Sequence, residues 1–434
     1  MASTFVQSPT SRLVLFSTQY LIQGLVLGII AEGLTANLKL AGIEASFIGV
    51  LMSAYYLTLS GKWLLGPATD LLFRGPLARV KRALILANLV LAAALCLAAA
   101  YSLNLPLWYL SVLVVCIAAA VCASDVITDA IAVSNTPADQ RGRLSGYMFT
   151  GMNVGLAAGG SGSLYLASRL NFSTIFLIAA CLVALQTLAV VCRLPLPPPE
   201  SSNHLGVDRS APPALRGYIA SFLSLLRSSR SRWALLFAFL PPGAMALSMP
   251  LQIALGVDVG YSEDDLANLN LWTAIASMPA TLLGGWLADR YGAVKTFAWS
   301  VLALTLPSVA LAILLANTGW YGTHLPAESA RHALFASFWV ICLMTALAGA
   351  VMVAARSAVC IRMAVREHQH MATHFTALMA LSNLANSFAA AWQGYTIDRF
   401  GYAPTLAADV VLGLAILALL LHPTVRGDQP RVPS

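Results

Sequence analysis

Apolar segments recur along the whole chain and are separated by short polar stretches. Each is about 20 residues long, which is the length of a helix that crosses the hydrocarbon core of a bilayer. The pattern predicts twelve such helices, at residues 12–35, 45–65, 82–101, 106–133, 143–168, 173–192, 232–256, 265–288, 294–316, 333–355, 371–397 and 402–422. We therefore expect an all-α polytopic membrane protein with twelve transmembrane helices.

The stretch between the sixth and seventh apolar segments has a different composition. It contains the run Pro197–Pro199, is rich in Ser and Arg, and has an amphipathic pattern at 215–226 that is typical of a helix lying on a membrane surface. We predict an N-terminal six-helix bundle at 1–192, a basic cytoplasmic linker with an amphipathic helix at 193–231, and a C-terminal six-helix bundle at 232–434.

Charge supports this interpretation. Charged residues make up 10% of the chain, whereas soluble domains carry about 25%. The net charge of +7 comes from Lys and Arg that gather in alternate loops, which is a topology signal and not the footprint of a nucleic acid. We expect a multi-pass protein with both termini in the cytoplasm and no nucleic-acid partner.

The sequence contains no motif for a metal or a nucleotide. The seven cysteines lie in or at the ends of apolar segments without a paired Cys-x-x-Cys motif, and a Gly-x-x-x-x-Gly-Lys-Ser/Thr loop is absent. We therefore predict no cofactor, with a proton gradient as the energy source. The expected partners are a small-molecule substrate, the proton and the lipid bilayer, and a monomer is adequate for this architecture.

Two carboxylates, Asp125 and Asp129, close the apolar segment that begins near Leu107. Their i, i+4 spacing places them on one helix face, and acidic residues inside a membrane-length segment usually face a polar cavity. Like charges this close repel, so the pair can share a proton. We interpret them as a proton-coupling site. The alternative is that they hold the helix against Arg141, Arg143 or backbone donors.

Polar side chains elsewhere in the apolar segments are candidates to line a solute cavity, because amides facing lipid are costly. The residues expected to do so are Gln19, Gln23, Lys62, Asn153, Asn383, Asn386 and Gln393. Interhelical hydrogen bonding is the alternative for the amides. Lys62 could pair with an anionic substrate or with the Asp residues, or reach the membrane surface. Glu32 is expected to be a solvated helix end, with a proton site as the alternative.

The glycines of the fifth segment, Gly151, Gly155 and Gly159, recur every four residues. This spacing is typical of closely packed transmembrane helices. In the seventh segment, Pro241, Pro242 and Pro250 predict a kinked or broken helix.

Two loops echo each other in the two halves of the chain. Gly66–Arg82 and Gly284–Thr296 each place an Asp at a helix end, followed by a Gly turn and basic residues. Weak matches at corresponding positions are typical of repeated transporter halves. Carboxylate–Arg and helix-end contacts there could latch a gate. The residues expected to form it are Asp70, Arg141, Asp289, Arg290 and Arg356.

These loops resemble the inner-loop signature of the major facilitator superfamily. Three further stretches, Lys62–Asp70, Asp125–Val133 with Arg141 and Gly142 after it, and Ala372–Ser387, are similar to the AmpG-type or peptide–acetyl-CoA transporter branch. That branch includes muropeptide permeases and siderophore permeases of the RhtX/FptX kind. The resemblance implies two six-helix bundles rocking by alternating access in a bacterial inner (plasma) membrane.

The resemblance also bears on substrate and direction. The chain lacks room for the extra spans of the long muropeptide permeases, which favours the compact siderophore permeases. Leu156 stands where drug antiporters carry a proline, which favours import. We expect proton-coupled symport of an amphipathic solute, a siderophore or a cell-wall peptide fragment.

Two alternatives remain open at this point. One is a proton-coupled efflux antiporter for drugs or metabolites. The other is a membrane-embedded transferase, for which Glu367, His368, His370 and His374 are the nearest candidate group. Their spacing does not place the three histidines on one helix face, so we expect a transporter and no enzyme.

Overall fold

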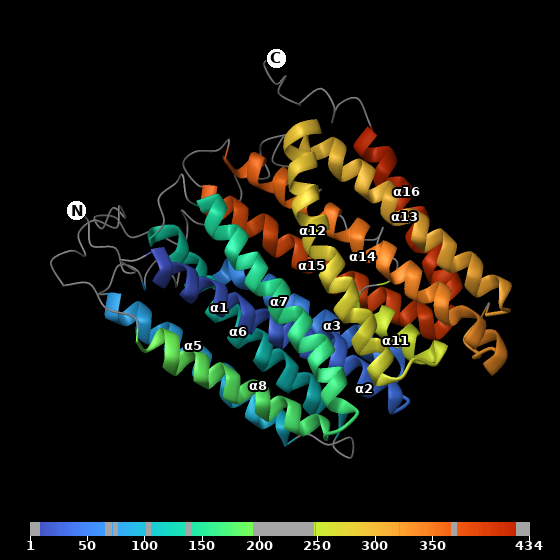
Figure 1. Cartoon of the computed structure of the whole chain (residues 1–434), viewed down its shortest axis with the longest axis horizontal. Coiled ribbons are helices and arrows are strands. Elements are labelled where there is room, and N and C mark those ends of the chain that lie inside the picture. The colour runs from blue at the N-terminus through green and yellow to red at the C-terminus, as the bar shows by residue number, and fades with distance from the viewer. Residues whose placement is uncertain are drawn as a thin grey trace. The chain divides into compact units, whose positions relative to one another are not determined.

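The computed structural model describes residues 9–65, 72, 77–100, 106–135, 141–193, 247, 249–320, 322–365 and 371–421. Every regular element in these ranges is a helix (Figure 1), so the all-α fold is confirmed. The helices coincide with the predicted spans, except that the first part of the seventh, 232–248, is described only at Leu247.

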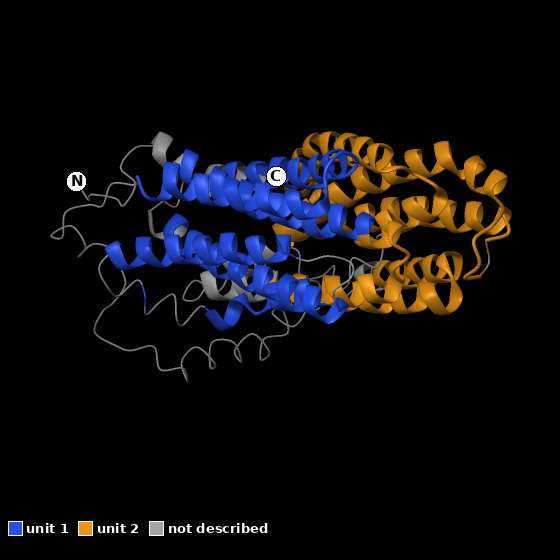
Figure 2. Cartoon of the chain, turned by 90° about the horizontal axis from the view of Figure 1, so that it is seen from below, with its two compact units in different colours: residues 1–37, 54–221 blue, residues 38–53, 222–434 orange. Residues whose placement is uncertain are grey.

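The first of two compact units comprises residues 1–37 and 54–221 (Figure 2). Within it α1 packs against α7, and α5 packs between α6 and α8. Its hydrophobic core lies where α1, α5 and α6 meet, around Leu15, Leu84 and Ile131. The helices of this part of the chain are α1 (Pro9–Gly28), η1 (Ile29–Leu34), α2 (Thr35–Leu40), α3 (Ala45–Ser60), α5 (Leu77–Ala99), α6 (Leu107–Asn135), α7 (Arg141–Ala167), α8 (Phe172–Gln186) and η3 (Thr187–Val191).

The second unit comprises residues 38–53 and 222–434. In it α14 packs against α12 and α13, and α16 packs against α13 and α15. Its core lies among α13, α14 and α16, around Val301, Met352 and Ile416. Its helices are the parts of α2 and α3 within 38–53, together with α11 (Met249–Val259), α12 (Glu263–Tyr291), α13 (Ala293–Asn317), α14 (Glu328–Val365), α15 (Met371–Phe400) and α16 (Tyr402–Leu421).

The predicted linker at 193–231 lies outside the described residues from 194 onward. The predicted domain boundaries therefore stay a prediction. Pro241 and Pro242 also lie outside them, whereas Pro250 stands in the first turn of α11, a position that proline tolerates.

Seven described helices are long and apolar enough to cross a membrane. Other helices at predicted spans are less apolar, among them α7, which is rich in Gly and Ser, and α15, which carries Asn, Gln and Thr. Polar content of this kind is compatible with a membrane protein when the polar face is turned toward other helices. The chain is a multi-pass membrane protein.

A glycine seam joins α1 to α7. A Cβ atom at Gly155 would overlap the carbonyl oxygen of Leu21, and one at Gly159 would overlap that of Leu25. The two backbones approach this closely only because glycine has no side chain. The predicted close packing of the glycine ladder is confirmed.

The prediction for Glu32 is wrong. Its side chain is buried, with 6% exposed, in the π-helical turn η1. A Cβ at Gly160 would overlap its carboxyl group, so that glycine makes room for the acid. The physical reason is that the helical path does not end near Glu32 but continues through α2 to Leu40.

Candidate functional site

The polar face of α6 carries the two predicted acids. Asp125 and Asp129 are half-buried, and both lie within α6 as expected. The Lys62 ammonium, in the helical turn that follows α3, lies 3.6 Å from Asp125 Oδ2, with side chains 13% and 18% exposed. Of the alternatives for Lys62, the structure shows the pairing with Asp125, and a contact of Lys62 with the solute stays a prediction.

Asp129 has a different partner. The Tyr20 hydroxyl, on α1, donates a hydrogen bond to Asp129 Oδ1. Tyr20, Lys62, Asp125 and Asp129 together form what we call the acid–lysine cluster. It holds two carboxylates and one ammonium group, on helices that a membrane would surround.

A neutral network lies beside this cluster and joins α1, α5 and α6. Asn88 Nδ2 donates to Gln19 Oε1 at 3.1 Å, Gln19 Nε2 donates to Ser124 Oγ at 3.1 Å, and Ser124 Oγ donates to Asn88 Oδ1 at 2.9 Å. All three side chains are buried. Because buried amides are costly unless hydrogen-bonded, this ring fixes the three helices against one another and positions the neighbouring Tyr20 and Asp125.

The structure thus gives Gln19 an interhelical hydrogen-bonding role. Gln23, one helical turn further along α1, is buried, and its Nε2 has no hydrogen-bond partner among the described residues. An unsatisfied buried amide points to a ligand or water that completes it. A solute contact for either residue stays a prediction.

The other predicted cavity residues are distributed over both units. Asn153 is half-buried on α7 in the first unit. Asn383 and Asn386 are half-buried on α15 in the second unit. Gln393, on the same helix, is buried and donates from Nε2 to Asp409 Oδ2 at 2.8 Å.

The predicted gating residues are only partly described. Asp70 lies outside the described residues, as does the side chain of Arg141, the first residue of α7. Asp289 and Arg290 are exposed at the end of α12, where the Arg290 guanidinium lies 5.2 Å from the Trp286 ring. Arg356 is buried on α14. The gating role of all five stays a prediction.

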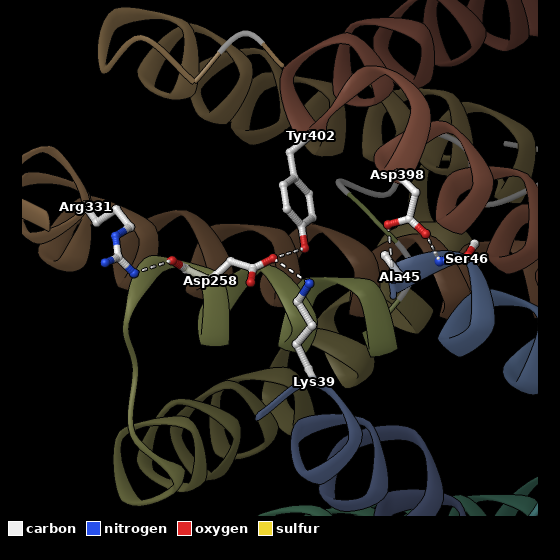
Figure 3. Close-up of polar contacts among 7 residues, drawn as sticks. All are labelled: Lys39, Ala45, Ser46, Asp258, Arg331, Asp398 and Tyr402. Carbon is white, nitrogen blue, oxygen red and sulfur yellow. Dashed lines mark hydrogen bonds and ion pairs between the residues drawn. The ribbon is translucent and has the colours of Figure 1, made fainter. Parts of the chain in front are cut away.

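The second unit contains polar contacts that no sequence pattern predicts (Figure 3). Lys39 Nζ lies 2.9 Å from Asp258 Oδ2, and the Tyr402 hydroxyl donates to the same oxygen at 2.7 Å. The sequence marks Lys39 only as a charge in a loop, and nothing in it links this residue to others more than 200 positions away.

A second contact of this kind involves the start of α3. Asp398, near the end of α15, accepts hydrogen bonds from the backbone N–H groups of Ala45 at 3.1 Å and Ser46 at 2.6 Å (Figure 3). The first N–H groups of a helix have no partner within it, and a carboxylate there is favoured by the helix dipole. Asp398 therefore caps α3 from a distant part of the sequence.

Most of the chain matches one sequence family. Residues 13–325 match the profile of the Major Facilitator Superfamily, and no curated protein sequence matches the chain. Among solved structures, the fold is similar to a D-xylose–proton symporter, with a TM-score of 0.71 and 12% identity over 97% of this chain and 99% of that one.

Two further structures share the fold. The nucleoside transporter NupG gives a TM-score of 0.65 and 13% identity over 95% of this chain and 99% of its own. A bacterial homolog of the human lysosomal transporter Spinster gives 0.61 and 15%, over 96% and 97%. Identities this low establish a common fold and leave the solute open.

Proposed function

The chain belongs to the Major Facilitator Superfamily, and we propose that it imports an amphipathic solute together with protons by alternating access. The family and its structural neighbours are transporters, which sets aside the transferase alternative. Of the residues behind that alternative, Glu367, His368 and His370 lie outside the described ones, as does the side chain of His374.

The observation that carries this proposal is the acid–lysine cluster. Ionisable residues inside transmembrane helices are rare and are typical of ion and proton pathways. Asp125 pairs with Lys62 and Asp129 accepts from Tyr20, so both acids have polar partners inside the first unit. The cluster is therefore built to hold charge within the membrane.

Charge counting suggests how many protons the cluster takes. Two carboxylates and one ammonium leave one net negative charge, which a single proton neutralises. During reorientation the cluster is closed off from water, and a neutral cluster has a lower free-energy cost in this low-dielectric interior than a charged one. We propose that the protein reorients readily only after one proton has bound to the carboxylate pair.

The Lys62–Asp125 pair links this proton to the solute. When Asp125 is ionised, it holds the Lys62 ammonium at 3.6 Å. When Asp125 is protonated, the attraction is lost, and the Lys62 ammonium can donate to an uncharged acceptor group of the solute instead, which keeps the cluster neutral. Proton binding would thus create the solute site, which couples the two.

The resemblance to the AmpG-type branch supports a siderophore or a cell-wall peptide fragment as the solute, and Leu156 in place of a proline supports import. The experiment is uptake into proteoliposomes under an imposed inward proton gradient. Ferric siderophores and anhydromuropeptides, each labelled, are offered separately. We expect accumulation of one of them that collapses when the gradient is dissipated.

Three variants sharpen this experiment. Asp125→Asn is expected to abolish accumulation against a gradient and to leave downhill exchange. Asp129→Asn tests whether the second acid is also needed. Glu328→Gln removes a carboxylate that is 79% exposed and distant in sequence, and it serves as the control that should transport as the wild type does.

Two results would contradict the proposal. Uphill transport by Asp125→Asn at the wild-type rate would remove the coupling role of the cluster. Loss of solute from the vesicles under the inward proton gradient would identify an efflux antiporter instead.

A further inference from the structure

A second buried acid, Asp409 on α16, has no part in the cluster described above. Its side chain is fully buried, with 0% exposed, in a helix of mostly apolar residues. Oδ2 accepts a hydrogen bond from Gln393 Nε2 at 2.8 Å. Oδ1 has no hydrogen-bond partner among the described residues.

The immediate surroundings of Asp409 supply no counter-charge from the described residues. The hydrogen-bonding groups next to its carboxyl are the side-chain amide of Gln393 and the backbone amide of Leu247. Neither group is charged. On α13, the packed neighbour, Lys295 lies in the first turn. Asp258 and Tyr402 stand at the end where α16 begins.

The titratable groups of the neighbouring helices α15 and α14 are exposed, bonded to other residues or placed at another level of α16. On α15, Tyr395 and Arg399 are exposed, and Asp398 is engaged by the start of α3. On α14, Arg356 follows Ala355, which shares a core with Ile416, two turns beyond Asp409 along α16. In the described part of the unit, no cation pairs with Asp409 as Lys62 pairs with Asp125.

We propose that Asp409 is a proton-binding site of the second unit and that its proton resides on Oδ1 in this conformation. An ionised carboxylate with one oxygen unpaired and no cation nearby is strongly disfavoured in an apolar interior. Protonation removes the charge while Oδ2 keeps the hydrogen bond from Gln393. This proposal does not depend on the role of Asp125 and Asp129.

Two hydroxyl side chains share a face of α16 with Asp409, on the side of the helix start where the charged contacts of Figure 3 lie. Tyr402, Thr405 and Asp409 recur at i, i+3 and i+7, so they share one face of α16. Thr405 Oγ1 lies 3.1 Å from Thr396 Oγ1 on α15, and the Tyr402 hydroxyl contacts Asp258. Hydroxyl groups both donate and accept hydrogen bonds, so the proposal assigns this face as the route by which the proton exchanges.

Asp409 also touches the backbone that precedes α11. Leu247, whose amide acts on the carboxyl group, is the one described non-glycine residue with a positive φ, at 55°. Such a backbone persists only when its surroundings hold it. Binding and release of the proton would change the contact between Asp409 and the Leu247 backbone, which lies in the seventh predicted span.

The test is infrared spectroscopy of the purified full-length protein in lipid. A protonated carboxyl group has a C=O stretch that is separate from the carboxylate bands. We expect a protonated-carboxyl band at neutral pH that Asp409→Asn lacks and Asp125→Asn retains. Equal bands in folded wild type and Asp409→Asn would overturn the proposal.

Two further variants keep the proposal testable if Asp409→Asn does not fold. Gln393→Leu removes the donor to Oδ2 and should shift the band to higher frequency, and an unshifted band would count against the proposal. Thr405→Val should slow hydrogen–deuterium exchange of the band several-fold. Its matched control is Thr305→Val, a buried threonine that bonds its own helix backbone on α13. Equal exchange in the two variants would overturn the hydroxyl route.

Discussion

The two units bury their acids in different ways. In the first unit, Asp125 has a cation, Lys62, within 3.6 Å. In the second unit, the described groups that act on Asp409 are an amide side chain and a backbone amide. A carboxylate with a cation at hand can remain ionised in a membrane, whereas one with neutral donors is more stable when protonated.

This difference suggests different roles for the two proton-binding sites. In the acid–lysine cluster, binding of a proton frees Lys62 to exchange partners, and the cluster therefore suits coupling to a solute. Asp409 changes charge only by gaining or losing a proton, and it therefore suits control of the helices around it. Single substitutions in each unit can break or sharpen this contrast.

The largest effect is expected from removing the cation. Lys62→Gln leaves two carboxylates without a counter-charge, so we expect a loss of about 3 kcal/mol of folding free energy, as for other broken buried pairs. The measurement is the thermal unfolding temperature of the protein in detergent. The double variant with Asp125→Asn should recover most of the loss, because it removes one of the two uncompensated acids. No recovery would show that Lys62 contributes through packing and not through charge.

A smaller effect is expected at the glycine seam. Gly155→Ala places a Cβ on the Leu21 carbonyl oxygen, so α1 must move, at about 1–3 kcal/mol of folding free energy. Because Tyr20 lies on α1, its bond to Asp129 should weaken, and proton-driven uptake should fall. The Asp409 infrared band should not change, because that acid belongs to the other unit.

Gly162→Ala is the matched control on the same helix. A Cβ at Gly162 would meet nothing within 4 Å. The two variants make the same chemical change and differ only in what the new methyl group meets. Equal stability and uptake would contradict the role of the seam.

Local periodicity explains what the sequence could predict. The helix boundaries follow from runs of apolar residues, the shared face of Asp125 and Asp129 follows from their spacing, and the glycine ladder follows from its four-residue repeat. Each of these signals lies within one helix. The fold class and these features needed no information on which helices pack together.

The rest depends on contacts between distant residues. Tyr20 and Asp129 are 109 residues apart, and Lys39 and Asp258 come from different halves of the sequence, so no local pattern marks either pair. The prediction for Glu32 fails because the helix continues past the end of its apolar run. Asp409 could have been found, since a lone acid within an apolar segment is itself a signal of function.

A charge-dependent effect is expected from Gln393→Glu, which places a second acid next to Asp409. While both are protonated they can share a hydrogen bond, but two ionised groups would repel. The folded variant then binds more protons than the unfolded chain, so its stability falls as pH rises. The measurement is the unfolding temperature across the pH range. Asn171→Asp, at an exposed position, is the control and should not fall in this way.

The smallest effects are expected from replacing two tyrosines, one in each unit, that donate hydrogen bonds to acids. The two variants compare the stability that such a bond contributes in each unit. Tyr20→Phe removes the one hydrogen-bond donor that Asp129 has among the described residues. Tyr402→Phe removes a donor from Asp258, which keeps Lys39 at 2.9 Å. A typical hydrogen bond contributes about 0.5–1.5 kcal/mol, and we expect Tyr20→Phe to lose the larger amount because Asp258 retains a second partner. Thermal unfolding of the two variants measures the difference. A larger loss for Tyr402→Phe would mean that Asp258 depends on its tyrosine more than on its cation, and that partner count does not decide how firmly these acids are held.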